Sequence, residues 1–236
     1  MTDTKLTFER YEKKYMIRPE QLEQFRRLLD SRLTPDRYFS STVCSLYYDT
    51  DDYRLIRTSI EKPVYKEKLR LRSYNVPAQD DNVFLELKSK FKSLGYKRRV
   101  MMRADQARDY LAGCGSAPED NQVQRELDWF LKCNPVSPKV FIACDRKAYV
   151  LKDDPLFRIT FDENLRWRST ELDLCLGSHG SAVLPADYDL MELKIPQSVP
   201  IWLSQLLSTC RIYPVSFSKY GTCYKENLIN GVIYDV

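Results

Sequence analysis

The sequence predicts an α+β fold in which antiparallel strands are interspersed with helices. Charged and apolar residues alternate over several stretches, most clearly in "YKEKLRLRSYN" (65–75), as expected of strands with two different faces. Turn-rich connections join such stretches as hairpins, and amphipathic stretches between them predict helices. No repeat, low-complexity tract or long linker interrupts the 236 residues, so we expect one domain over residues 1–236.

In the first half of the chain, a strand over 8–17 is followed by a helix through 19–33, which Pro19 opens. A β-branched and aromatic strand over 41–50 precedes a short helix within 51–60, and the acids at 49–52 are expected to cap that helix. Alternation then predicts three consecutive strands, over 65–75, 82–92 and 96–103.

In the second half, helices are predicted over 104–112 and 121–133, and Leu127, Phe130 and Leu131 form the apolar stripe of the second. Alternation predicts a pair of strands over 139–150 and 157–168, joined by the turn "KDDP", and a last strand over 188–196. Helices over 199–210 and 216–230 close the chain.

Composition excludes several classes of protein. The chain has no run of about 18 apolar residues and no signal-peptide pattern, so we expect neither a membrane span nor export. Its seven cysteines form no CxxC pair, which argues against a zinc knuckle or a disulfide framework and fits a reducing cytoplasm. His179 is the single histidine of the sequence and lies in a loop stretch. Because there is no second histidine, His-rich metal sites and triads that need two histidines are excluded.

Positive charge is concentrated in one segment. The net charge is +4, but residues 62–103 contain twelve lysines and arginines against four acids, so the rest of the chain is slightly acidic. On the predicted strands these cations share faces: Lys66, Lys68, Arg70 and Arg72 alternate on one strand, and Lys88 and Lys90 on the next. On the third strand Lys97 and Arg99 share one face and Arg98 takes the other; we favour Arg99 for the polar side.

The polar face of one such strand usually lies in water. When several such strands pair, their cations lie opposite one another, and like charges in opposite positions destabilise a sheet. A polyanion that neutralises the cluster explains it best, and the planar fork of arginine is suited to phosphate oxygens.

Three carboxylates, Glu12, Glu86 and Glu192, occur on the same predicted faces. Their hard oxygen atoms suit Mg²⁺ or Mn²⁺ that bridges phosphate groups. Glu12 and Glu86 would serve equally well to neutralise neighbouring cations, and the sequence leaves both roles open. If the sheet closes, its charged faces line a tunnel and the helices cover the apolar outside.

Eight motifs in order between residues 10 and 220 resemble the catalytic domain of vacuolar transporter chaperone (VTC) polyphosphate polymerases: "RYEKKY", "SLYYDT", "YKEKLRLRSY", "FLELKSK", "YKRRV", "FRITFDENLR", "MELK" and "SFSKY". That domain belongs to the triphosphate tunnel metalloenzyme, or CYTH-like, superfamily. The resemblance implies an eight-stranded antiparallel β-barrel, flanked by helices, whose tunnel binds a triphosphate and a divalent metal, Mn²⁺ or Mg²⁺. The implied activity is transfer of the γ-phosphate of ATP to a growing polyphosphate chain, with release of ADP.

The resemblance also implies roles for individual residues. Catalytic contacts to phosphate fall on Lys14, Arg70, Arg72, Lys88, Arg146, Arg158 and Lys219. Further triphosphate contacts fall on Lys68, Lys90, Arg99 and Ser218. The metal-binding glutamate is Glu192, with Glu12 and Glu86 beside it as candidates. The implied partners are ATP and inorganic polyphosphate rather than nucleic acid; a membrane partner and the oligomeric state are left open.

The first strand departs from the wider superfamily, whose triphosphatases usually carry ExExK there. Here the corresponding positions are Arg10, Glu12 and Lys14. One carboxylate fewer weakens the case for a two-metal site that activates water, whereas a polymerase uses a phosphate oxyanion as its nucleophile.

Two alternatives to the polymerase remain. One is a tripolyphosphatase or nucleoside triphosphatase of the same fold. The other is a non-catalytic binder of polyphosphate or nucleic acid, in which Tyr47, Tyr48, Tyr65 and Tyr74 stack on bases.

Overall fold

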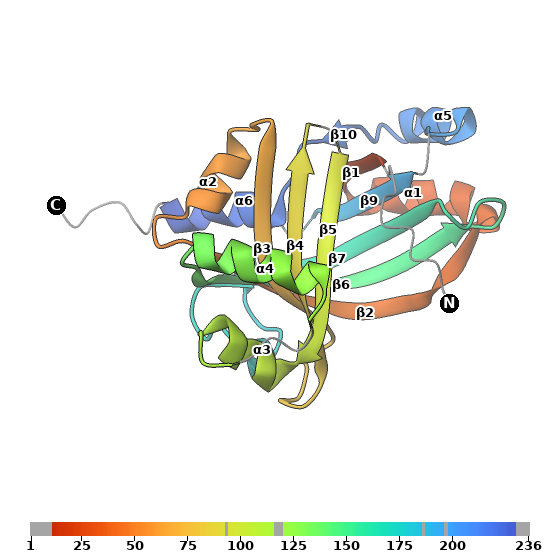
Figure 1. Ribbon diagram of the computed structural model, residues 1–236. Helices are drawn as coiled ribbons and strands as arrows, with labels where there is room; N and C mark the ends of the chain where they lie inside the picture. Colours follow the sequence, from red (N-terminus) through yellow and green to blue (C-terminus); the bar gives the residue numbers. More distant parts are fainter. Residues whose placement is uncertain (1–10, 93, 116–119, 186, 196–197, 230–236) are drawn as a thin grey trace. The chain divides into compact units, whose positions relative to one another are not determined.

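A computed structural model describes residues 11–92, 94–115, 120–185, 187–195 and 198–229 (Figure 1). The chain divides into two compact units, each assembled from three stretches of sequence. Unit 1 comprises Met1–Ser41, Cys144–Leu165 and Leu184–Phe217, and unit 2 comprises Thr42–Ala143, Arg166–Val183 and Ser218–Val236. The expectation of a single domain over residues 1–236 stays a prediction.

The strands form one antiparallel sheet in the order β10-β1-β9-β7-β6-β2-β3-β4-β5, with β8 beside β7. The long strands are β1 (Tyr11–Ile17), β2 (Leu33–Asp49), β3 (Tyr65–Tyr74), β4 (Asn82–Phe91), β5 (Leu94–Arg103), β6 (Ser137–Leu151), β7 (Arg158–Arg168) and β9 (Asp189–Ile195). Two short strands, β8 (Ser181–Ala182) and β10 (Pro214–Val215), accompany them. Among the described residues this order ends at β10 and β5 without pairing between them. The α+β class is confirmed, whereas closure into a barrel is not seen in the hydrogen bonds.

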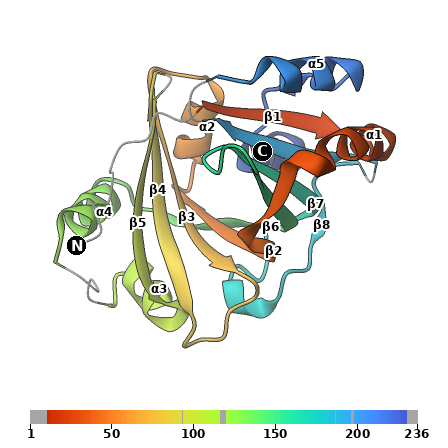
Figure 2. The ribbon, with the colours of Figure 1, turned by 90° about the vertical axis from the view of Figure 1, so that its right-hand side faces the viewer.

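In unit 2, strands β3, β4 and β5 form a meander whose apolar side is covered by two helices (Figure 2). These helices are α3 (Ala104–Leu111) and α4 (Gln122–Cys133). Leu69, Leu85 and Val100 are buried on this side of the sheet, together with Leu127 and Phe130 of α4. The predicted stripe of the second helix is therefore confirmed, and the opposite side of the same strands carries the cations. Helix α2 (Arg54–Ile60) and helix α6 (Lys219–Cys223), continued by a π-helical turn over Tyr224–Leu228, complete the unit.

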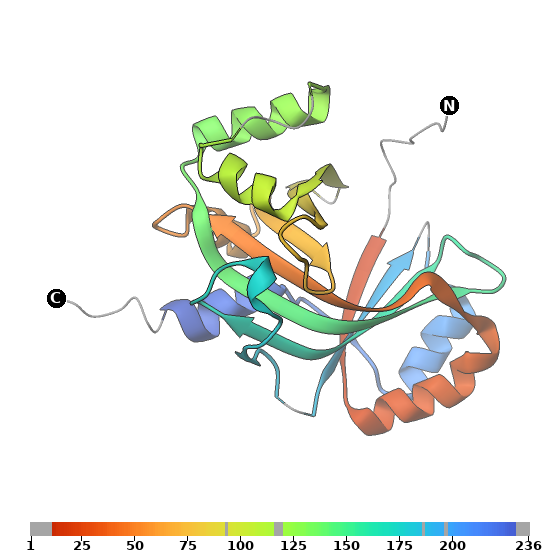
Figure 3. The same ribbon diagram turned by 90° about the horizontal axis from the view of Figure 1, so that it is seen from below.

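In unit 1, the apolar side of β1, β9 and β7 packs against helices α1 (Pro19–Leu29) and α5 (Ile201–Thr209), which lie side by side (Figure 3). Tyr15, Met191 and Phe161 form one buried row across the three strands. Helix α1 begins at Pro19 as predicted, because proline has no N–H to satisfy in the first turn.

Two boundaries differ from the prediction. The first helix ends at Leu29, a short 3₁₀ turn spans Asp30–Arg32, and β2 begins at Leu33 rather than at 41. Pro35 cannot continue a helix, and the early part of β2 is largely exposed, so it lacks the alternation that marks a strand. The last helix starts only at Lys219, where the hydroxyl of Ser218 accepts from the Gly221 N–H at 3.2 Å.

The remaining elements lie within a few residues of their predicted ranges. Residues 8–10, 196 and 230, at the ends of three predicted elements, lie outside the described residues. None of the described helices has both the length and the apolar character needed to cross a membrane. No disulfide joins any of the seven cysteines.

Candidate functional site

The polar face of unit 2 is organised in rows across neighbouring strands. Directly opposite residues share a face, so the register defines which side chains meet. One row runs Tyr47, Arg70, Glu86 and Arg99 from β2 to β5, and the next runs Lys68, Lys88 and Lys97 from β3 to β5. Arg98 takes the other side and pairs with Glu126 of α4. The favoured choice of Arg99 for the polar side therefore agrees with the register.

Glu86 lies at the centre of this face, and its side chain is completely buried. Arg70 donates to its Oε2 from Nε (2.8 Å) and Nη2 (2.6 Å), and Arg99 donates to its Oε1 from Nε (2.7 Å) and from Nη2. Burial alone would raise the pKa of Glu86, but Arg70, Arg72 and Arg99 hold it well below its ordinary value of 4.5. The arrangement favours the neutralising role for Glu86, because guanidinium groups already engage both oxygens.

Beyond this row the face is rich in lysine. Lys68, Lys88 and Lys97 stand opposite one another, and Lys66 stands opposite Lys90 in the following row. Lys88, Lys90 and Lys97 are exposed, whereas Arg70 is buried. Burial lowers the pKa of Lys97, and Arg99 adds to this effect against the opposing influence of Glu86. Cations in opposite positions destabilise a sheet, so these rows gain stability when an anion binds them.

A chain of contacts fixes the C-terminal helix α6 beside this face. The buried carboxylate of Asp49 accepts from the Tyr220 hydroxyl at 2.9 Å and from two backbone N–H groups of α2 at 2.9 and 3.0 Å. The Tyr220 ring stacks on Tyr47, with 4.8 Å between centroids, and the Tyr47 hydroxyl accepts from Arg70 Nη1 at 3.2 Å. Asp49 thus caps α2, as the sequence predicts, and also anchors α6.

The anchored helix presents two predicted phosphate contacts, Ser218 and Lys219. Lys68 Nζ donates to Ser218 Oγ at 2.9 Å, which ties the start of α6 to β3. Burial would raise the pKa of Tyr47, but Arg70 and Arg72, with a further contribution from Lys219, hold it below its ordinary value. The phenol of Tyr47 therefore lies in a strongly positive environment.

The polar face of unit 1 mixes cations with carboxylates. Two rows cross β1, β9 and β7: Lys14, Glu192 and Thr160 in one, and Glu12, Lys194 and Arg158 in the other. Lys14 Nζ donates to the carbonyl of Phe217 at 3.1 Å and lies 3.4 Å from Glu12 Oε1. Lys194 Nζ lies 3.1 Å from Glu192 Oε1.

The two predicted arginines of this face, Arg146 and Arg158, are paired with aspartates. Arg146 and Asp162 form two parallel hydrogen bonds of 2.6 and 2.7 Å. Burial would lower the pKa of Arg146, but Asp162, with a smaller contribution from Glu192, raises it above its ordinary value. Arg158 Nε lies 2.7 Å from Asp36 Oδ2 as an ion pair that lacks the alignment of a hydrogen bond. The charges of this face are thus largely compensated within unit 1.

Glu12 and Glu192 are the carboxylates that suit a metal. They lie on adjacent strands and share a face. Within the described ranges no group of three or more His, Cys, Asp or Glu residues is placed to hold a metal ion. Two carboxylates nevertheless fit Mg²⁺ or Mn²⁺, because these ions commonly take their other ligands from water and substrate phosphate.

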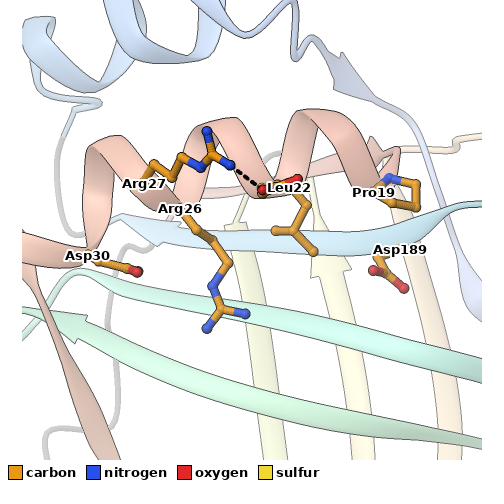
Figure 4. A pocket seen from close by; sticks show the side chains of 7 residues that line it. Pro19, Leu22, Arg26, Arg27, Asp30 and Asp189 are labelled. Atoms are coloured by element: carbon orange, nitrogen blue, oxygen red, sulfur yellow. Dashed lines mark hydrogen bonds and ion pairs between the residues drawn. The ribbon is translucent and has the colours of Figure 1, made fainter.

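A cavity of about 390 Å³ in unit 1 contains none of the predicted site residues. It is lined by residues of α1, by Asp30 of the 3₁₀ turn that follows, and by Asp189 at the start of β9 (Figure 4). Arg27 pairs there with Glu23, and Arg26 donates to the Tyr149 hydroxyl at 2.5 Å. The cavity has charges of both signs and lies on the side of the strands that the helices cover. It is therefore not part of the charged faces.

The four tyrosines considered for base stacking differ in their contacts and exposure. Tyr47 stacks on Tyr220 and Tyr48 belongs to the buried apolar cluster, whereas Tyr65 and Tyr74 are about half exposed. His179 is an exposed loop residue whose Nε2 lies 2.8 Å from Glu171 Oε2.

The predicted residues therefore fall into two groups. Unit 2 contains Lys68, Arg70, Arg72, Glu86, Lys88, Lys90, Arg99, Ser218 and Lys219, and unit 1 contains Glu12, Lys14, Arg146, Arg158 and Glu192. Sequence reasoning did not assign Asp49, Tyr220 or Thr160 to the site. Alternation in "FRITFD" places Thr160 on the face of Arg158, which was a usable signal, but no local pattern joins Asp49 to Tyr220.

Comparisons with known proteins agree with this architecture. The family model of the VTC domain matches residues 9–227. Among solved structures, a candidate adenylate cyclase from Bacillus halodurans is similar, with a TM-score of 0.54, 14% identity and coverage of 94% of this chain and 96% of that one. A candidate adenylyl cyclase from Hippeastrum with a dominant triphosphatase activity gives a TM-score of 0.53 and 13% identity, covering 95% of this chain and 97% of that one. Comparison with curated proteins finds no match. The chain belongs to the VTC domain family and shares the fold of the triphosphate tunnel, or CYTH-like, proteins.

Proposed function

We propose that the protein is a metal-dependent polyphosphate polymerase, which transfers the γ-phosphate of ATP to a polyphosphate chain and releases ADP. The observation that carries the proposal is the row Lys68, Lys88 and Lys97 beside the row that contains Arg70 and Arg99, in a chain of the VTC domain family. Lysines next to arginines that a carboxylate holds in place suit a long polyanion whose reacting end lies among the arginines.

In the proposed reaction, a terminal oxygen of the polyphosphate attacks the γ-phosphorus of ATP. The bond from that phosphorus to the β,γ-bridging oxygen breaks, and ADP leaves with the electron pair. The nucleophile is already an oxyanion, so no side chain has to remove a proton from it. The protein has to align two anions and screen their repulsion.

The residues of unit 2 suit this task. Glu86 fixes the guanidinium groups of Arg70 and Arg99 before any substrate binds, and such fixed donors stabilise charge without reorganisation. Lys88 is exposed and supplies a point charge that adapts to phosphates in different positions. A divalent cation, Mn²⁺ or Mg²⁺, held by Glu192 and Glu12 in unit 1, would further neutralise phosphate charge when bound.

A triphosphatase of the same fold is the second candidate, because the similar Hippeastrum protein has a dominant triphosphatase activity. That reaction needs an activated water. On the first strand, Glu12 is the only carboxylate at the positions where the superfamily's triphosphatases carry two, which favours the polymerase.

The test is incubation of the purified protein with γ-labelled ATP and Mn²⁺, with the products resolved on a gel and by thin-layer chromatography. A ladder of long labelled chains is expected. Labelled orthophosphate without chains would replace the proposal by the triphosphatase, and unchanged ATP would contradict both.

Lys88→Gln is expected to lower kcat/KM for chain synthesis by about 10- to 100-fold, the effect of losing one charge-assisted phosphate contact of about 1.5–3 kcal/mol. Lys132→Gln removes the same charge from an exposed position on α4 and should leave the rate unchanged. Equal rates for the two variants would contradict a role for the lysine row.

A further inference from the structure

Thr160 occupies an unusual position on the polar face of unit 1. It lies within β7, is completely buried, and its hydroxyl has no hydrogen-bond partner among the described residues. A buried polar group left in this way costs about 1–3 kcal/mol, and native proteins keep few of them. The carboxylate of Glu192 stands directly opposite on β9, yet the hydroxyl does not donate to it.

The surroundings limit which group can satisfy this hydroxyl. Glu192 shares the row with Thr160, and Glu12 lies in the adjacent row on β1. The oxygen atoms of Glu12, Glu192 and Thr160 therefore lie on one face of three neighbouring strands. A hard divalent cation accepts lone pairs from carboxylate and hydroxyl oxygens alike.

We propose that Thr160 Oγ1 is a neutral oxygen ligand of the divalent cation at Glu192 and Glu12. The inference rests on the proposed function for the presence of that cation. A third ligand without charge adds an oxygen atom but no negative charge, so it does not weaken the attraction of the bound cation for phosphate. Lys194 Nζ, 3.1 Å from Glu192 Oε1, is the group that the cation would displace.

The test measures binding of Mn²⁺ alone, from the electron paramagnetic resonance signal of free Mn²⁺ during titration with protein. Thr160→Val removes the hydroxyl with little change in shape, and we expect it to weaken Mn²⁺ binding by about tenfold or more. Thr160→Ser keeps the hydroxyl and should bind within about twofold of the wild type. Ser73→Ala is a matched control, since Ser73 Oγ on β3 is also buried without a partner but lies in unit 2, outside the row of Glu192.

Several outcomes would overturn the inference: equal affinity of Thr160→Val and the wild type, an equal loss in Ser73→Ala, or no Mn²⁺ binding by the wild type. Circular dichroism checks that each variant is folded, and Thr160→Ala replaces the valine variant if that one is not. Failure of the proposed function is distinguishable. If Mn²⁺ binding depends on Thr160 but the protein makes no polymer from ATP, the inference is supported and the polymerase proposal is contradicted. If the protein makes polymer but Thr160→Val binds Mn²⁺ as tightly as the wild type, the polymerase proposal is supported and the inference is contradicted.

Discussion

Replacing Glu86 by glutamine tests whether this residue neutralises arginines or binds metal. The substitution keeps the size of the side chain and one acceptor oxygen, but it removes the charge and places an NH₂ donor against guanidinium groups. The side chains of Glu86 and Arg70 are 0% and 7% exposed, so water cannot replace the lost partner of Arg70. Arg99, at 30% exposed, can recover part of its hydration.

The expected loss of stability is therefore dominated by Arg70. Removing one partner of a buried ion pair typically destabilises a protein by about 3–5 kcal/mol, and the remaining acceptor oxygen of glutamine places this variant near the lower value. Total stabilities of domains are about 5–15 kcal/mol, so the variant should still fold. Urea unfolding followed by tryptophan fluorescence, in buffer with a metal chelator, measures the difference.

Glu67→Gln is the matched control, because Glu67 lies on the same sheet but is only partly buried; its carboxylate accepts from Ser89 Oγ at 3.2 Å and from the Tyr65 hydroxyl at 2.5 Å. It should change the stability by less than about 1 kcal/mol. An unchanged urea midpoint for Glu86→Gln in the chelator would refute the neutralising role. A difference that appears only when Mn²⁺ is added would assign Glu86 to the metal instead.

Three further results are expected. Because the pKa of Glu86 is depressed, its contribution to stability is complete above about 4.5 and is lost as the pH falls further toward its native pKa; urea titrations at several pH values should show a smaller acid loss for Glu86→Gln than for the wild type. Because the pKa of Lys97 lies below the ordinary lysine value of 10.5, a rising pH removes the charge of Lys97 earlier than that of an ordinary lysine. The affinity for tripolyphosphate measured by calorimetry should fall as Lys97 loses its charge, and Lys97→Arg should shift this fall to higher pH. Tyr220→Phe should destabilise the protein by about 1–3 kcal/mol in urea by removing a donor to buried Asp49, whereas Tyr213→Phe, at an exposed position, should not; equal midpoints would contradict the anchoring of α6.

The strands and their two faces were predictable because the period of two is a local property of the sequence. In β3 and β4 the alternation is strict, and the apolar members Leu69 and Leu85 are indeed buried against helices. On the later strands, the motifs of a known family indicated which cations lie on the polar face. The face of each predicted side chain on β3 and β4 was therefore accessible from the sequence alone.

Register and long-range contacts were not predictable in the same way. The neutralising arrangement of Glu86 depends on Arg70 and Arg99 standing in one row, and a shift of either strand by one residue would move them to the other face. Asp49 and Tyr220 meet although 171 positions separate them in the sequence. The early part of β2 lacks alternation because it is exposed on both sides.

The distribution of charge between the two polar faces bears on how a polymerase would divide its tasks. On the polar face of unit 2 the buried carboxylate of Glu86 is outnumbered by cations. On the polar face of unit 1, Lys14, Lys194, Arg146 and Arg158 are each matched by an acid. The two kinds of cation in unit 2 also differ in their freedom. Arginines held by Glu86 fix an orientation, which a reacting phosphate requires. In a polymerase, the rows of lysines would attract each phosphate of a chain alike, which would permit the product to advance by one unit after every transfer.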